Sequence, residues 1–247
     1  MPSILLFGPG DRIVPFAAGI PDTWTVYLAA AAAPEGLARP VTPVDPAHEF
    51  GAERPDVVAD LYVDRESKED LLGLLASGGF PGAALVSNTL TMTATDVAAR
   101  IECAMPVIGI SYIPSIFESS SILEAATALQ NGEEASLQAL ARLKELTGKE
   151  LERVVDRVAL VSARTLAMII NEAAFALMEG VAGVDDIDTA MKLGTNYPEG
   201  PLRWADRIGL DVVLSILDAL HAEYREERYR PCVLLRQLVR AGQPIGA

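Results

Sequence analysis

The stretch Ile4-Leu5-Leu6-Phe7-Gly8-Pro9-Gly10-Asp11-Arg12-Ile13 decides the fold of the first half of this 247-residue chain. Its four leading apolar residues have the length of a short strand, and glycine follows at once. Continuous apolar runs bounded by turn residues are typical of parallel strands covered on both faces. Similar runs cover residues 24–28, 57–63, 83–86 and 106–112, and helical spacing of apolar residues is found over 68–76 and 94–103. The alternation predicts an α/β domain with a parallel sheet.

The second half of the chain is predicted to be helical. An amphipathic helix is expected over 131–150, and no strand pattern follows residue 156. Residues 158–178 are apolar almost all round, as in a helix buried in a bundle or at a subunit interface. Shorter helices are expected over 185–191, capped by Asp185 and stopped at Gly194, over 212–224, capped by Asp211, and after Pro231. The proline-rich stretch 29–55 is expected to be loop without a long helix. We therefore predict an α/β domain over 1–155 and an all-α domain over 156–247.

Composition narrows the classes of partner. A formal net charge of −14 and a pI near 4.6 oppose binding to nucleic acid and to anionic membranes, which depends on clustered Lys and Arg. The apolar runs are shorter than the roughly 18 residues of a spanning helix, and the N-terminus does not resemble a secretory signal. Cys103 and Cys232 lie far apart, which gives no support to a disulfide framework or a metal site. A cytoplasmic protein acting on a small molecule is expected.

The glycine motif after the first apolar run matches part of a dinucleotide-binding fingerprint. Such a fingerprint has three glycines: for the tight turn, for close approach of the pyrophosphate, and for helix packing against the sheet. Gly8 and Gly10 fill the first two places and Ile13 the third, and Pro15 falls early in the expected helix. No acidic residue for the ribose follows the second run. An ordinary turn between strand and loop explains the motif equally well.

The helical half carries a more specific pattern. It contains Asn171-Glu172-Ala173, Glu179-Gly180-Val181-Ala182, residues 185–194, Tyr197-Pro198-Glu199-Gly200-Pro201, Gly209-Leu210-Asp211 and Tyr229-Arg230-Pro231. In order and spacing these resemble the C-terminal domain of 3-hydroxyacyl-CoA dehydrogenases over about 90 residues. The resemblance implies a reduced Rossmann-like domain followed by a helical dimerisation domain, a homodimer, and NAD and acyl-CoA as ligands. Each motif also has a structural explanation as a helix start, helix stop or turn.

The same resemblance assigns candidate catalytic residues in the first half. Ser87-Asn88-Thr89 is similar to the family's Ser-Asn-Thr, whose serine helps hold the substrate oxygen. Ser111 stands where the family has the histidine that accepts the hydroxyl proton. A serine hydroxyl has an unassisted pKa far above neutral and cannot replace an imidazole. The glutamate that orients the imidazole is expected near residue 123, and here Glu124 comes one place later, which in a strand reverses the facing of the side chain unless a one-residue gap restores it.

Further positions implied by the resemblance concern the cofactor. Gly8, Pro9 and Gly10 would lie at the pyrophosphate of NAD, and Asn88 is a further candidate contact. Asp64 and Lys68 match positions near the nicotinamide-side ribose, or equally form a helix-capping pair. The family's catalytic asparagine aligns with Ala163. The two histidines, His48 and His221, are interpreted as surface residues.

Two functions of different class follow. The first is an NAD-dependent oxidoreductase of fatty acid metabolism that oxidises a 3-hydroxyacyl thioester or related 3-hydroxy acid, with impaired or altered catalysis. The second is a non-catalytic homodimer that binds a nucleotide or acyl ligand in a regulatory or scaffold role. Loss of the histidine base motivates the second, because it is expected to cost on the order of 10² to 10⁴ in rate.

Overall fold

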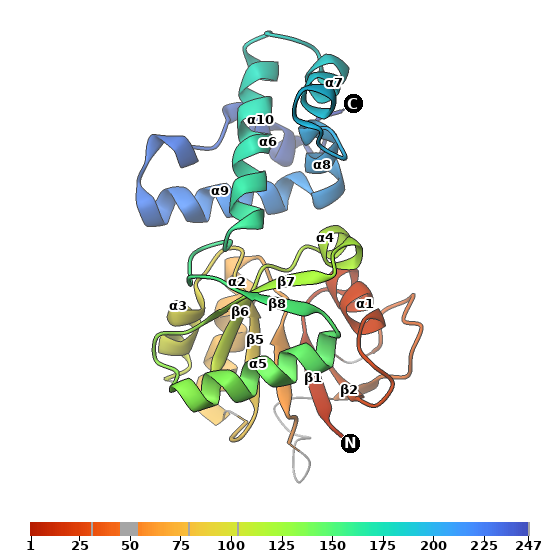
Figure 1. Ribbon diagram of the computed structural model, residues 1–247, viewed down its shortest axis with the longest axis vertical. Helices are drawn as coiled ribbons and strands as arrows, with labels where there is room; N and C mark the ends of the chain where they lie inside the picture. The colour runs from red at the N-terminus through yellow and green to blue at the C-terminus, as the bar shows by residue number, and fades with distance from the viewer. Residues whose placement is uncertain (31, 45–53, 79, 103, 247) are drawn as a thin grey trace. The chain divides into compact units, whose positions relative to one another are not determined.

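The computed structural model describes residues 1–30, 32–44, 54–78, 80–102 and 104–246 (Figure 1). The chain divides into two compact units, Met1–Leu160 and Val161–Ala247, whose placement relative to each other is not determined. The predicted domains divide five residues earlier, after residue 155. Each unit is considered by itself.

The first unit contains an eight-stranded sheet with the order β3-β2-β1-β4-β5-β6-β7-β8. The strands are β1 (Ser3–Phe7), β2 (Thr25–Ala29), β3 (Thr42–Val44), β4 (Val57–Asp60), β5 (Ala84–Asn88), β6 (Val107–Ile110), β7 (Ile122–Thr127) and β8 (Glu150–Arg153). All neighbours pair in parallel except β6 and β7, which are antiparallel. The reversal of strand order between β1 and β4 is that of a doubly wound α/β fold. The predicted fold class is confirmed.

Helices cover both faces of this sheet (Figure 1). They are α1 (Gly10–Ala18), α2 (Arg65–Gly78), α3 (Ala94–Arg100), α4 (Pro114–Ser119) and α5 (Glu133–Thr147). One hydrophobic cluster joins the sheet to α1, α4 and α5, and a second joins the opposite face to α2 and α3. Burial on both faces explains why the strands of the sheet centre are continuously apolar.

Two strands depart from the sequence predictions. β3 lies inside the stretch predicted to be loop, and β8 lies beyond the helix that was predicted to reach residue 150. β3 is an edge strand of three residues, where Pro43 is tolerated because one side of the strand needs no ladder donor. β8 is the opposite edge strand, and its Glu150-Leu151-Glu152-Arg153 sequence is mostly exposed. Neither strand has the apolar run by which strands were recognised.

The second unit is helical, as predicted. It contains α6 (Ser162–Met178), α7 (Val184–Thr195), α8 (Pro201–Ile208), α9 (Leu210–Tyr224), the short 3₁₀ helix η1 (Glu227–Tyr229) and α10 (Val233–Ala241). Within the described ranges, none of the helices combines the length and the apolar character needed to cross a membrane.

Several helix ends in this unit differ from the predictions. α6 begins at Ser162 rather than at residue 158, because Ala159 and Leu160 have φ angles of 59° and 49°, outside the helical region. The N-caps of α7 and α9 are Gly183 and Gly209, and each predicted cap is the second residue of its helix, two residues after the N-cap. Asp185 and Asp211 there still favour the helices through the helix dipole. α7 passes through Gly194 and ends before Asn196, which is left-handed.

Candidate functional site

Three of the predicted site residues, Ser87, Asn88 and Ser111, lie at the carboxyl ends of β5 and β6. In the parallel register Asp60 pairs with Ser87, and Ser87 pairs with Gly109. These three positions therefore form one row across the sheet, and the side chains of Asp60 and Ser87 are directed to the face covered by α2 and α3. Ligands of doubly wound folds bind outside the carboxyl ends of the strands. This end of the sheet is the candidate site.

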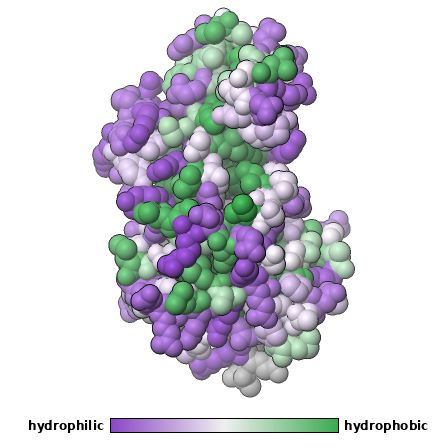
Figure 2. Space-filling model, viewed as in Figure 1, coloured by the Kyte–Doolittle hydropathy of each residue, from purple (hydrophilic) through white to green (hydrophobic). Residues whose placement is uncertain are grey.

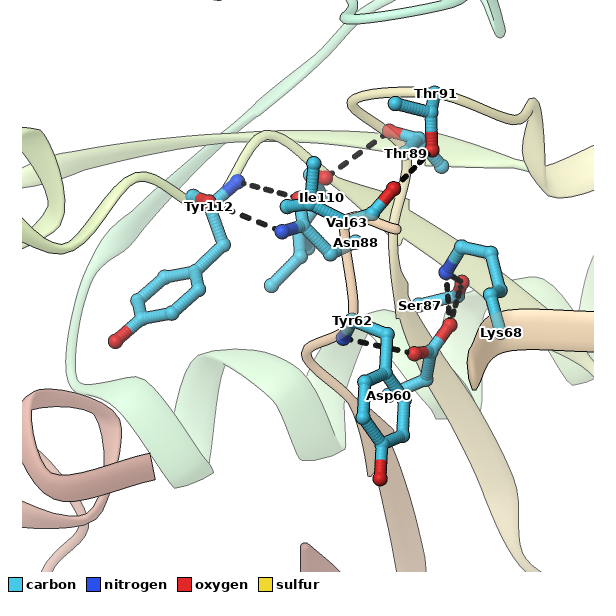
Figure 3. Close-up of polar contacts among 10 residues, drawn as sticks. All are labelled: Asp60, Tyr62, Val63, Lys68, Ser87, Asn88, Thr89, Thr91, Ile110 and Tyr112. Carbon is cyan, nitrogen blue, oxygen red and sulfur yellow. Dashed lines mark hydrogen bonds and ion pairs between the residues drawn. The ribbon is translucent and has the colours of Figure 1, made fainter. Parts of the chain in front are cut away.

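A buried polar cluster occupies this row (Figure 3). The Lys68 ammonium on α2 pairs with Asp60 Oδ2 and donates a hydrogen bond to Ser87 Oγ over 3.0 Å. Ser87 Oγ in turn donates to Asp60 Oδ2 over 2.7 Å, and the Tyr62 backbone N–H donates to Asp60 Oδ1. The side chains of Lys68 and Asp60 are 0% exposed. A buried ion pair is tolerated only when further hydrogen bonds satisfy it, and Ser87 supplies them on both sides.

The structure gives Asp64 and Lys68 different environments. Asp64 is exposed, and its carboxylate accepts the backbone N–H of Ser67 at the start of α2, over 2.8 Å. It therefore acts as a helix-capping residue. Lys68 is directed into the sheet and takes no part in the cap. Burial and strand-to-helix packing place its ammonium against Asp60, a residue that the sequence analysis did not single out.

Asn88 and Thr89 fix the backbone around Ser111. The Asn88 side chain accepts from the Tyr112 backbone N–H and donates to the Tyr112 carbonyl, each over 3.1 Å (Figure 3). The Thr89 hydroxyl donates to the Ile110 carbonyl over 3.0 Å. Ser111 is thus held between two side-chain clamps from the end of β5. Asn88 itself is fully buried and acts on the backbone.

Ser111 and Glu124 share one face of the sheet. β6 and β7 are antiparallel, with Gly109 opposite Ala126 and Ile110 opposite Ala125. β6 ends at Ile110, and one further step of the same register would bring Ser111 opposite Glu124. Directly opposed residues of an antiparallel pair point to the same side. Leu123 points to the other side and is buried in the core. The structure thus gives Glu124, and not residue 123, the facing that a partner of residue 111 requires.

An aromatic cluster lies on the opposite face, beneath α1. The rings of Phe16, Tyr112 and Phe117 lie 5.1 to 5.5 Å apart. The Tyr112 hydroxyl donates to the Arg12 carbonyl over 2.7 Å. Burial raises the pKa of Tyr112, and the nearby positive charge of Arg12 offsets only part of this rise. The hydroxyl therefore remains a neutral donor that ties the end of β6 to the first turn of α1.

The glycine loop forms a tight turn with little open space. Gly8 has a φ angle of 152°, and a Cβ there would lie 2.9 Å from Leu61 Cβ. A Cβ at Gly10 would lie 3.0 Å from Pro34 Cβ. Arg12 is 8% exposed, and its Nη1 has no hydrogen-bond partner within the described part of the chain.

The groups predicted to hold NAD do not fit an extended dinucleotide. The open side of Gly10, which the pyrophosphate would need, is contacted by Pro34. Asp64 caps α2, while Lys68 and Asn88 are buried and bonded within the protein. Nη1 of Arg12, which is buried and has no hydrogen-bond partner among the described residues, is a donor that suits an anion.

The histidines, the cysteines and Ala163 add little to the candidate site. His48 and Cys103 lie outside the described residues. His221 is half-buried on α9, and Cys232 is buried, which raises the pKa of its thiol. Ala163 is buried near the start of α6. The described ranges contain no group of three or more His, Cys, Asp or Glu side chains arranged to hold a metal ion.

Asp60 and Arg12 are the site residues that sequence reasoning missed. Asp60 interrupts the apolar run 57–63, eight residues before Lys68, and β4 ends at this residue. A charged pair between the strand end and the next helix could therefore have been inferred. Arg12 lies inside the glycine motif, at a position that is otherwise apolar on the sheet-facing side of α1. A single arginine at this otherwise apolar position indicates that the glycine loop differs from an ordinary strand-to-helix turn.

Comparisons with known proteins agree with this fold. Residues 160–245 match the family model described as 3-hydroxyacyl-CoA dehydrogenase, C-terminal domain. A probable 3-hydroxybutyryl-CoA dehydrogenase of Bacillus subtilis is 38% identical over 77% of this chain and 66% of its own length. One of Deinococcus radiodurans is 35% identical over 76% of this chain and 67% of its own length. The chain thus aligns with about two thirds of the length of these relatives.

A solved structure extends the likeness to nearly the whole chain. The (S)-3-hydroxybutyryl-CoA dehydrogenase PaaH1 of Ralstonia eutropha superposes with a TM-score of 0.76 at 25% identity, over 97% of this chain and 94% of that one. The doubly wound sheet, the helical second unit and the motifs of both units occur in the same order as the resemblance implied. This chain belongs to the 3-hydroxyacyl-CoA dehydrogenase family.

Proposed function

We propose that this chain is a 3-hydroxyacyl-CoA dehydrogenase-type oxidoreductase with strongly impaired turnover, acting on a 3-hydroxyacyl thioester or a related 3-hydroxy acid. Family membership supports the reaction class and substrate class. The serine at position 111 supports the impairment, and it is the observation that carries the proposal. Dehydrogenation of a secondary alcohol needs a group that accepts the hydroxyl proton as hydride leaves.

The proposed roles of the site residues follow from their facing. Ser111 would hydrogen-bond the reacting oxygen, since its side chain lies on the site face and its backbone is clamped by Asn88 and Thr89. Glu124, which the continued register would bring opposite it, would orient a bound water or the substrate hydroxyl by accepting a hydrogen bond from it. Ser87 makes both of its hydrogen bonds inside the protein, so a substrate contact from it stays a prediction.

NAD is the hydride acceptor implied by the family. The positions that would bind it are occupied by internal contacts of this chain, as described for Gly10, Lys68 and Asn88. Weak cofactor binding is thus a second source of low turnover, in addition to the missing imidazole.

A non-catalytic homodimer is the second candidate, and the internally engaged cofactor positions favour it. In this case the fold would bind an acyl ligand or nucleotide without chemistry. The apolar character of α6 supports self-association. A cavity of about 600 Å³ opens along this helix, lined by Met168, Ile169 and Ala176 of α6 and by Met191 of α7. Figure 2 shows apolar side chains on the visible surface of the second unit.

The two candidates are separated by one series of measurements on the purified chain. NADH is titrated and followed by fluorescence or calorimetry, and acetoacetyl-CoA is then added while the oxidation of NADH is recorded. Slow oxidation that saturates with both ligands supports the impaired enzyme. Binding of acetoacetyl-CoA without any oxidation, at saturating NADH, supports the non-catalytic homodimer and overturns the first proposal.

A further inference from the structure

The segment after β2 lies where a dinucleotide would need to lie. In a dinucleotide-binding turn the second glycine lacks a side chain so that the pyrophosphate can approach the backbone. The space that Gly10 leaves is occupied here, since a Cβ on Gly10 would lie 3.0 Å from Pro34 Cβ. Two residues later, a Cβ on Gly36 would lie 3.8 Å from Val14 Cγ1 of α1. The chain therefore runs across the first turns of α1.

This segment is anchored by several contacts. The guanidinium of Arg39 donates to the carbonyl oxygens of Ile20 and Trp24, the latter over 2.9 Å, between α1 and β2. Leu37 and Val41 pack against the main hydrophobic cluster of the first unit. A segment held by a charged group on backbone carbonyls and by two apolar side chains has a defined position. It is not a free loop that the cofactor would displace without cost.

The side chain of Arg12, two residues after Gly10, is buried. Arg12 occupies the third position of α1, on its sheet-facing side, and is 8% exposed. Its Nη1 is buried without a hydrogen-bond partner among the described residues. Burying a charged donor costs free energy when it makes no hydrogen bond, so Nη1 gains no stability from the described residues.

We propose that residues 32–41, anchored by Arg39 and pressed onto Gly10 through Pro34, close the dinucleotide groove of this chain from within. The protein's own backbone replaces the ligand at the amino end of α1, and NADH binds only when this segment is displaced. Loosening the segment therefore increases the affinity for NADH. The inference concerns cofactor binding alone and does not rest on turnover or on the roles of Ser111 and Glu124.

The position of the segment is tested by a cysteine pair. In the variant Gly10→Cys/Pro34→Cys the two Cβ atoms would start 3.0 Å apart. A disulfide has roughly 3.5–4.5 Å between its Cβ atoms, so a shift of about half an ångström allows the bond to form. Mild oxidation is expected to form the bond in most molecules, measured as the loss of two free thiols relative to the reduced protein by mass spectrometry after alkylation. The matched pair Gly10→Cys/Pro40→Cys, with the second cysteine at an exposed proline of the same segment, is expected to stay reduced. Equal oxidation of the two pairs, or of neither, would overturn the proposed position.

The closure itself is tested by NADH affinity without any acyl substrate. Pro34→Gly removes the contact at Gly10, and Arg39→Ala removes the anchor without changing Gly10. Each is expected to lower the Kd for NADH at least tenfold, by fluorescence titration. The matched variant Pro81→Gly, at an exposed proline before β5 and outside the segment, should leave the Kd unchanged. Circular dichroism melts show that the variants are folded. The proposal is wrong if the native chain and both loosened variants bind NADH with the same Kd, whether tight or weak. It is also wrong if none of the three binds NADH. Turnover is not measured, so the test remains separate from that of the proposed function.

Discussion

A single side chain, Ser111, separates this site from one that could move a proton at neutral pH. Its surroundings are otherwise well defined: Asn88 and Thr89 fix its backbone, and Glu124 shares its face of the sheet. A hydroxyl at this point can hold an oxygen but cannot take its proton, because its pKa lies far from neutral.

Restoring the imidazole is therefore expected to restore part of the rate. We predict that Ser111→His raises NADH-dependent reduction of acetoacetyl-CoA by about 10²-fold, the lower end of what a positioned base contributes. The rate is measured in the Arg39→Ala background, so that cofactor entry is the same in all proteins. Ser115→His, four residues along, is the control and should have no effect. Equal rates for the two histidine variants would show that position 111 is not beside the reacting oxygen.

The buried ion pair predicts a large loss of stability. Lys68→Met leaves the Asp60 carboxylate buried without its cation and should lower the free energy of unfolding by about 3–5 kcal/mol. Lys144→Met, which removes an exposed lysine paired with Glu150, should change it by less than about 1 kcal/mol. Urea unfolding measures both. A loss at Lys68 as small as that at Lys144 would mean that the pair is not buried in solution.

Tyr112 predicts a specific pH dependence of stability. Folding raises the pKa of this phenol through burial, so above about pH 10 the folded chain retains a proton that the unfolded chain releases. Its contribution is complete below that pH and declines as the pH rises further. Tyr112→Phe should cost about 1 kcal/mol near pH 8 through the lost bond to Arg12, and its stability should fall less steeply above pH 10. Parallel unfolding curves of both proteins from pH 8 to 11 would contradict this.

At the scale of elements, the sequence predicted those whose pattern comes from burial. β1, β2, β4, β5 and β6 have apolar runs because helices cover both faces of the sheet. β3 and β8 could not be found this way, since edge strands bury little and draw their stability from hydrogen bonds to a neighbour far away in the sequence. α1 tolerates Pro15 at its sixth position at the loss of one helical hydrogen bond.

The start of α8 illustrates an element fixed by one side chain from elsewhere. Asp188 on α7 is buried, and its carboxylate accepts the backbone N–H groups of Leu202 and Arg203. We predict that Asp188→Ala lowers the stability of the second unit by about 1–2 kcal/mol, as loss of a helix cap does. Asp185→Ala, at an exposed position of the same helix, should have an effect below about 0.5 kcal/mol. Thermal unfolding followed by circular dichroism compares them, and equal midpoints would refute the capping role.

At the scale of the whole molecule, the site was less predictable than the fold. The sequence placed Ser87, Asn88 and Ser111 at strand ends, where the structure has them. It could not show that Lys68 turns inward to Asp60 or that Pro34 reaches Gly10, because both contacts join residues through packing and carry no periodic signal. The facing of Glu124 likewise depends on the register between β6 and β7, which spacing alone does not determine.

Self-association belongs to this scale as well. If the cavity along α6 is part of a subunit interface, Ile169→Arg places a charge in it and should convert a dimer of about twice the chain mass into a monomer. Light scattering after size-exclusion chromatography measures the mass. Leu137→Arg, at an exposed leucine of α5 in the first unit, is the control. A native chain that is monomeric at micromolar concentration, or an Ile169 variant that stays dimeric, would contradict the homodimer.

The hydrogen bonds of Ser87 affect how its motif is read in other chains. This hydroxyl makes hydrogen bonds with a lysine and an aspartate that are both buried. Replacing any one of these three residues therefore leaves each of the other two buried with one hydrogen-bond partner fewer. Asp60, Lys68 and Ser87 can therefore be replaced only together. A chain that no longer turns over substrate would still keep its Ser-Asn-Thr, because the fold requires the serine. Where a lysine and an acidic residue accompany the serine at these separations, the Ser-Asn-Thr motif indicates common ancestry. The residue at position 111 is then the one that indicates catalytic activity.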